Sequence, residues 1–103
     1  MRKLTLMIGL NDKDTKQQEI TTLDAYKVVG NILQRDCTIT EGRGVYTHED
    51  GTQVFETSLV VDILDFDNSI RENWIIEKVK QIKEALNQES VAFQEQEIIS
   101  NLM

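Results

Sequence analysis

Residues 37–64, CTITEGRGVYTHEDGTQVFETSLVVDIL, have the pattern of two β-strands joined by a tight turn. Asp50-Gly51 supplies the positive φ that a short hairpin turn requires. In the second arm, Phe55, Leu59, Val61 and Ile63 alternate with other residues and so share one face. The stretch therefore predicts an antiparallel hairpin whose arms span about 37–48 and 52–64.

The residues before this hairpin predict a strand and then a helix. Leucine or isoleucine occupies every second position from 4 to 10, which is the period of a β-strand over about 3–10. A polar loop over 11–20 follows, and Thr21 or Thr22 is a suitable N-cap for a helix that runs to about Arg35. Its apolar stripe recurs with helical spacing and consists of Ala25, Val28, Val29, Ile32 and Leu33. Gly30 lies on the flank of this stripe, so we expect close packing against the sheet there.

The residues after the hairpin repeat the same order. Ile75, Val79, Ile82 and Leu86 form the apolar stripe of a helix over about 70–87, and residues 90–99 predict a last, partly charged edge strand. The element order is β-α-β-β-α-β. We therefore predict one α+β domain over residues 1–103 with a ferredoxin-like fold, in which two helices cover one face of a four-stranded antiparallel sheet.

The hairpin is longer than the first strand, so it should project from the sheet by roughly 10–15 Å. Four apolar side chains lie in the projecting part, and a two-stranded ribbon cannot bury them by itself. These residues, Val45, Tyr46, Val54 and Phe55, form the predicted interface of a homo-oligomer.

The composition restricts the partners. The chain has a net charge of −7, and residues 47–103 hold most of the excess acid, which argues against nucleic acid as a ligand. No stretch approaches the roughly 20 apolar residues of a membrane span, nor is there a pattern typical of a signal peptide. A single cysteine, Cys37, excludes an intrachain disulfide, and we expect a cytoplasmic protein.

No metal or cofactor motif is present, because one His and one Cys cannot form a typical zinc site. No catalytic triad is visible either. The candidate ligand-binding residues are Asn11 and Lys13 after the first strand, Arg43 between two glycines, and Tyr46 with His48 near the hairpin tip. Arg43 suits an anionic group, whereas Tyr46 and His48 are two residues apart and would share a face as an acid–base pair.

Two phrases carry a resemblance to a known family. LTLMIGLNDKD over 4–14 and ITEGRGVYTHEDGTQVFETSLVVDIL over 39–64 resemble small uncharacterised ferredoxin-like proteins of phages and mobile elements of Gram-positive bacteria. The resemblance implies an accessory protein of a bacterium or its phage, and it implies no particular activity.

Four functions follow from these features. The leading prediction is a non-enzymatic binding or accessory protein that forms a homo-oligomer. The alternatives are a sensor or sponge for a small anionic ligand such as a nucleotide, and an inhibitor whose acidic half covers a basic host protein. The fourth is a small enzyme built on a dimeric ferredoxin-like barrel.

Overall fold

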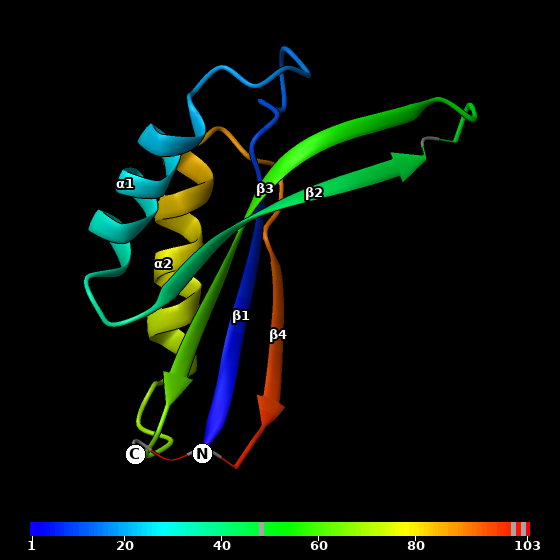
Figure 1. Cartoon of the computed structure of the whole chain (residues 1–103). Coiled ribbons are helices and arrows are strands. Elements are labelled where there is room, and N and C mark those ends of the chain that lie inside the picture. Colours follow the sequence, from blue (N-terminus) through cyan, green and yellow to red (C-terminus); the bar gives the residue numbers. More distant parts are fainter. Residues whose placement is uncertain (48, 100, 102) are drawn as a thin grey trace.

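The computed structural model describes residues 1–47, 49–99, 101 and 103. The elements follow one another as β1 (Arg2–Gly9), α1 (Thr22–Leu33), β2 (Thr38–Thr47), β3 (Gln53–Asp65), α2 (Glu72–Ala85) and β4 (Ala92–Glu97). The four strands form one sheet in the order β2-β3-β1-β4, with antiparallel pairing throughout. The two helices lie on the same side of this sheet (Figure 1). The predicted ferredoxin-like fold is therefore confirmed.

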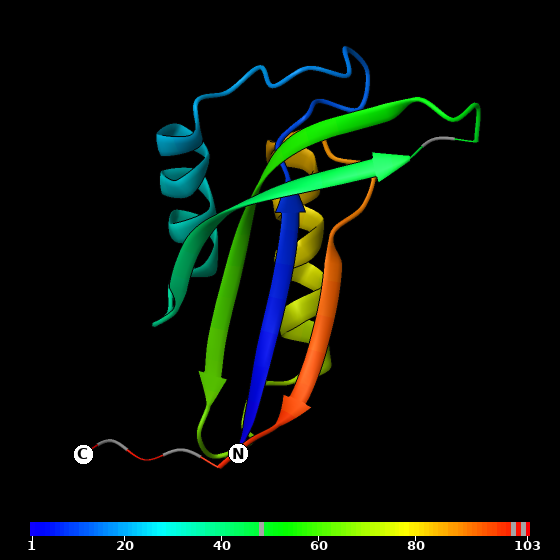
Figure 2. The same ribbon diagram turned by 45° about the vertical axis from the view of Figure 1, so that its right-hand side comes forward.

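Strand alternation separates a buried face from an open face. In β1, Leu4, Leu6 and Ile8 point toward the helices, and the facing residues of β3 are Leu59, Val61 and Ile63. The buried stripes of α1 and α2 complete this core with Ala25, Val29, Leu33, Ile75 and Ile82. The opposite face of the sheet has no helix over it (Figure 2).

Helix α1 begins and ends as its residues predict, with one exception. The hydroxyl of Thr21 accepts a hydrogen bond from the backbone N–H of Asp24 at 3.1 Å, and Gln34 ends the helix in the left-handed region. Gly30 does not pack closely on the sheet. A Cβ at this position would meet nothing within 4 Å, so the expectation of close packing there was wrong.

Helix α2 begins at Glu72, two residues later than expected. The residues before it form a turn that is held by hydrogen bonds to a carboxylate at the end of β3. Asp65, at the end of β3, is buried and accepts the backbone N–H groups of Ser69 and Ile70 at 3.0 and 3.1 Å. It also pairs with Arg2 at 2.9 Å, and the Arg2 guanidinium donates to the Ile70 carbonyl. One carboxylate thus joins β1, β3 and the entry to α2.

The predicted projection of the hairpin is confirmed. Pairing between β1 and β3 stops at Gly9 and Ser58, whereas β2 and β3 remain paired out to Thr47 and Gln53. We call the part beyond β1, residues 43–47 and 53–57, the arm. Its five-residue strands add about 16 Å at 3.3 Å per residue, and the arm bends away from the helices (Figure 1). Gly51 at its tip has φ 85°, as the Asp-Gly turn predicts.

Neither helix, over the residues that the structure describes, is long and apolar enough to cross a membrane. The helices contain 12 and 14 residues.

Replacing Asp65 tests how much its ion pair and hydrogen bonds at the start of α2 stabilise the fold. Asp65→Ala would remove the acceptor of the Arg2 Nε–H and of the Ile70 N–H, and one of the two acceptors of the Ser69 N–H. We therefore expect the free energy of unfolding to fall by about 3 kcal/mol. Urea denaturation followed by circular dichroism measures it. Asp67→Asn, in the same turn but exposed, is the control and should change stability by less than about 1 kcal/mol. Equal effects of the two substitutions would contradict the role assigned to Asp65.

Candidate functional site

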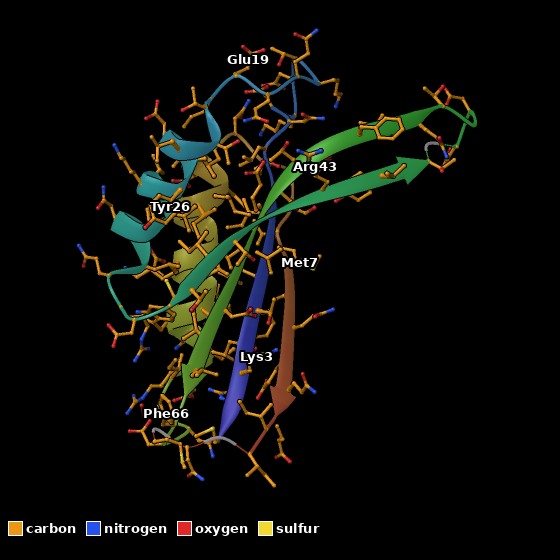
Figure 3. The ribbon with its side chains drawn as sticks, viewed as in Figure 1. Lys3, Met7, Glu19, Tyr26, Arg43 and Phe66 are labelled. Atoms are coloured by element: carbon orange, nitrogen blue, oxygen red, sulfur yellow. The ribbon has the colours of Figure 1, made fainter. Side chains whose placement is uncertain are left out.

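The open face of the sheet carries polar and small side chains where the arm begins. The alternation that buries Leu59 and Val61 turns Glu56 and Ser58 of β3 outward, on the same face as Met7 and Gly9 of β1. Met7 is labelled on this side of the sheet in Figure 3. Tyr46 of β2 shares the face, because it lies opposite Val54.

These side chains line a cavity of about 470 Å³, hereafter the arm-base cavity. Its walls come from the sheet, the loop after β1 and the segment between α2 and β4. The lining includes Met7, Gly9, Asn11, Asp12, Lys13, Lys16, Tyr46, Val54, Glu56, Ser58, Gln88, Glu89, Ser90 and Ala92. Residues from four separate parts of the chain therefore meet at one site.

Glu56 is held in place at the base of the arm. Its Oε2 accepts the backbone N–H of Asn11 at 2.9 Å. The carboxylate lies directly over Gly9, where a Cβ would be 2.5 Å from Oε1. Only glycine at position 9 leaves room for this arrangement, since real Cβ contacts are never so short.

Tyr46 lies over a second glycine. A Cβ on Gly44 would be 3.1 Å from the Tyr46 hydroxyl and 3.1 Å from its ring, so the phenol lies flat along the strand above Gly44. Gly44 is the partner of Glu56 in the ladder. The phenol and the carboxylate therefore line the cavity from neighbouring strands. The phenol can donate a hydrogen bond, and the carboxylate can accept one or balance positive charge.

The loop after β1 is fastened to the end of α2. Asn87 Nδ2 donates to Asp12 Oδ2 and to Asp14 Oδ2, both at 2.9 Å, and Gln88 Nε2 donates to the Asn11 carbonyl at 2.8 Å. The Lys13 N–H also reaches the Asn87 carbonyl at 3.0 Å. These bonds hold one wall of the cavity in place.

The environment of Asp12 stabilises its charged form. The Asn87 amide, followed by the backbone N–H groups of Asp14 and Thr15, holds the pKa of the Asp12 carboxyl below its usual value. A lowered carboxyl pKa means that the ionised form contributes to stability, and this contribution is lost on protonation.

The structure brings together three of the five ligand-binding residues predicted from the sequence. Asn11, Lys13 and Tyr46 line the arm-base cavity. Arg43 lies on the opposite face of the arm, because it is an odd number of residues from Tyr46. His48 lies outside the described residues. Of the predicted interface residues, Val45 and Phe55 face the helix side and Tyr46 and Val54 face the cavity.

Sequence reasoning did not identify Glu56, Gln88 or Asn87. Glu56 did leave a signal, because it is a carboxylate between Val54 and Ser58 on one strand face. Its partner Asn11 is 45 residues away, so only the β1–β3 register places the two together.

The described residues contain no cluster of three or more His, Cys, Asp or Glu side chains that could hold a metal ion. Cys37 is half-buried against the core, and burial raises the pKa of its thiol. A raised pKa disfavours the thiolate, so Cys37 is not suited to act as a nucleophile.

Two solved structures of a phage SAM lyase are similar to this chain. The complex with S-methyl-5'-thioadenosine is 28% identical, covers 93% of this chain and 80% of its own, and has a TM-score of 0.67. The apo structure is also 28% identical, covers 92% and 78%, and has a TM-score of 0.66. These neighbours support the expected resemblance in its fold and its link to phages. A Gram-positive source stays a prediction.

CutA from Pyrococcus horikoshii is similar in fold alone. It is 18% identical, covers 99% of this chain and 88% of its own, and has a TM-score of 0.54. No family model matches the chain, and no curated protein matches it.

The expectation of a non-enzymatic binding protein is overturned by the similarity to an enzyme over most of the chain. That expectation assumed that chemistry would have to occur at the exposed hairpin tip, beside His48. The structure offers a different place, since Glu56 and Tyr46 both line the arm-base cavity, where the loop after β1 forms a wall. The enzymatic alternative is therefore the better one.

Gly9→Ala tests the position of Glu56. The added methyl group cannot coexist with the Glu56 carboxylate, so the side chain should swing away and release the Asn11 N–H. We expect a large change in the Asn11 amide chemical shift in ¹⁵N NMR spectra, with the fold retained. Gly30→Ala is the control, because its Cβ meets nothing, and it should stabilise the protein by about 1 kcal/mol. An unchanged Asn11 amide in Gly9→Ala would rule out this placement of Glu56.

Acid titration tests the hydrogen bond from Asn87 to Asp12, which holds the loop after β1 against the end of α2. Because the folded pKa of Asp12 is depressed, its stabilising contribution is complete above the ordinary carboxyl pKa of about 3.9 and is lost as the pH falls below it. Asn87→Gly removes the amide but suits the positive φ at this position (48°). We expect the Asp12 pKa measured by NMR to rise toward its ordinary value. Asn68→Gly, at another positive φ (55°), is the control and should leave Asp12 unaffected.

Proposed function

We propose that this chain is a lyase that cleaves S-adenosylmethionine (SAM) and releases S-methyl-5'-thioadenosine. The observation that carries the proposal is the 28% identity over 93% of the chain to a phage SAM lyase bound to that compound. The arm-base cavity supports it, because its volume of about 470 Å³ falls in the usual range of ligand pockets, about 300–1,000 Å³. A single domain, a cytoplasmic location and a phage source belong to the same proposal.

The chemistry requires one bond to break. The bond between the sulfonium sulfur and Cγ of the amino acid chain is cleaved, and its electron pair leaves with the sulfur as a neutral thioether. The substrate's own carboxylate can supply the electrons for a new bond to Cγ, which closes a five-membered lactone. This step balances without water or an external base, so the protein needs chiefly to hold the substrate in a folded conformation.

Glu56 is the side chain best suited to bind the substrate's ammonium group. An anion placed against the sulfonium would stabilise the substrate more than the transition state, in which that positive charge disappears. The ammonium charge persists throughout the reaction, so a carboxylate beside it binds both states. The Tyr46 phenol is placed to donate a hydrogen bond to the ribose or to the substrate's carboxylate, and Lys13 and Lys16 add positive charge at the cavity wall.

The test is to incubate the purified protein with SAM and to follow S-methyl-5'-thioadenosine by liquid chromatography. Mass spectrometry of the four-carbon product distinguishes a lactone from a hydrolysed acid or an alkene. Glu56→Gln keeps the acceptor for the Asn11 N–H but removes the charge, so we expect kcat/KM to fall by about 10- to 100-fold. Tyr46→Phe should cost about 5- to 10-fold, as expected for one neutral hydrogen bond.

The controls are matched to each substitution. Tyr26→Phe on α1 concerns a tyrosine with the same exposure as Tyr46, 49%, and Glu77→Gln concerns an exposed carboxylate of α2. Both should retain full activity. If the wild-type protein forms no S-methyl-5'-thioadenosine, the proposal is rejected. Binding of SAM without turnover would favour the small-ligand sensor instead.

A further inference from the structure

Gln88 lines the arm-base cavity, and the proposed bond cleavage gives it no role. It lies just after α2 and is buried, with an exposed fraction of 8%. Its backbone is fixed by the end of the helix. Asn87 has a φ of 48°, and the Gln88 N–H donates to the Lys83 carbonyl at 2.9 Å, which is a common way for a helix to end. The position of Gln88 is therefore set by α2.

The side-chain nitrogen of Gln88 is fully used. Nε2 donates to the Asn11 carbonyl at 2.8 Å and to the Leu86 carbonyl at 3.3 Å. A side-chain amide has two N–H donors and one acceptor oxygen. Turning the amide over would place its oxygen against two carbonyl oxygens, so its orientation is fixed. The one polar side-chain atom that Gln88 can offer to a ligand is Oε1.

This oxygen has no partner within the described part of the chain. The side-chain hydrogen bonds of Gln88 all involve Nε2. Over the same residues, no fully buried side-chain oxygen lacks a hydrogen-bond partner. Oε1 is therefore not fully enclosed, although the residue that carries it is more than nine-tenths buried. A fixed acceptor in such a place favours a ligand that donates a hydrogen bond.

The Asn11 peptide relates Gln88 to Glu56. Asn11 donates its N–H to Glu56 at 2.9 Å and accepts from Gln88 at 2.8 Å, so the two side-chain atoms are at most about 9 Å apart. Gln88 also borders a larger hollow between α2 and β4, which Asn11 does not line. We assign the oxygen to the arm-base cavity, because the Asn11 peptide ties Gln88 to a carboxylate of that cavity. One molecule the size of SAM can reach both side chains.

We propose, on the basis of the lyase function above, that Gln88 Oε1 accepts a hydrogen bond from the exocyclic amino group of adenine and thereby selects the base of the substrate. The substrate's ammonium group is charged and suits Glu56. Its ribose hydroxyls can donate or accept, so they do not require a pure acceptor. The adenine amino group only donates, and it is neutral.

The fixed orientation of Gln88 gives this contact its specificity. A freely turning amide could serve adenine or hypoxanthine, which carries an oxygen in place of the amino group. Gln88 cannot turn without losing its bonds to Asn11 and Leu86. Hypoxanthine would therefore place its oxygen against Oε1, and both acceptors would lose hydrogen bonds to water without gaining a donor.

The test compares S-methyl-5'-thioadenosine with S-methyl-5'-thioinosine, its counterpart with hypoxanthine as the base. Isothermal titration calorimetry of the purified protein gives the Kd of each compound without any turnover. We expect the adenine compound to bind about 30-fold more tightly. Equal affinities would overturn the proposal, even in a protein that cleaves SAM. A protein that binds neither compound would overturn it as well.

Two substitutions assign the preference to Gln88. Gln88→Met has a similar length and no acceptor oxygen, so the ratio of the two Kd values should fall to within about 3-fold of one. Gln88→Lys places a donor there, so it should bind the hypoxanthine compound more tightly than the adenine compound. Displacement of Asn11 in either variant would weaken both compounds alike and leave their ratio unchanged. Circular dichroism checks the fold.

Gln81→Met is the matched control, because Gln81 lies on α2 and its amide donates to Glu77 alone among the described residues. It should keep the ratio of the wild type. If Gln88→Met also keeps that ratio, Gln88 does not select the base and the proposal is rejected. A chain that binds the adenine compound selectively through Gln88 but forms no S-methyl-5'-thioadenosine from SAM would support this contact and reject the lyase alone.

Discussion

The antiparallel register of β1 against β3 is the constraint on which the rest of the structure depends. It begins where Arg2 faces Asp65 and ends where Gly9 faces Ser58. The buried Asp65 carboxylate, joined to Arg2 and to the turn before α2, holds the first of these ends. Because side chains alternate along a strand, a shift of one residue would turn the apolar residues of β1 to the open face and expose the core.

The same register determines the position of the site proposed for the lyase reaction. Pairing of β1 with β3 ends after eight residue pairs, at Gly9 and Ser58, so β3 continues beyond its neighbour and the arm must project. It also places Gly9 beneath Glu56 and brings the Asn11 N–H within hydrogen-bonding distance of that carboxylate. The arm therefore has two distinct faces. One carries Glu56 and Tyr46 above the cavity, and the other carries the exposed Val45 and Phe55.

The two faces of the arm have different physical requirements. Apolar side chains on a two-stranded ribbon are costly in water, since such a ribbon is at best marginally stable alone. The site proposed for the lyase reaction must be held firmly, because small displacements of reacting groups lower the rate strongly.

The sequence alone determined the element order, the helix at Thr21, the Asp-Gly turn and the projection of the hairpin. Each depends on local periodicity, capping or strand length, and these can be recognised from a few neighbouring residues. It also indicated Asn11, Lys13 and Tyr46 as candidate ligand residues. Only the tertiary structure decided that Glu56 meets Asn11, that Asn87 fastens the loop and that Arg43 faces away from the cavity. These contacts join residues as many as 75 positions apart. They follow from the register of the strands and from the way the chain folds back on itself, and no local pattern predicts them.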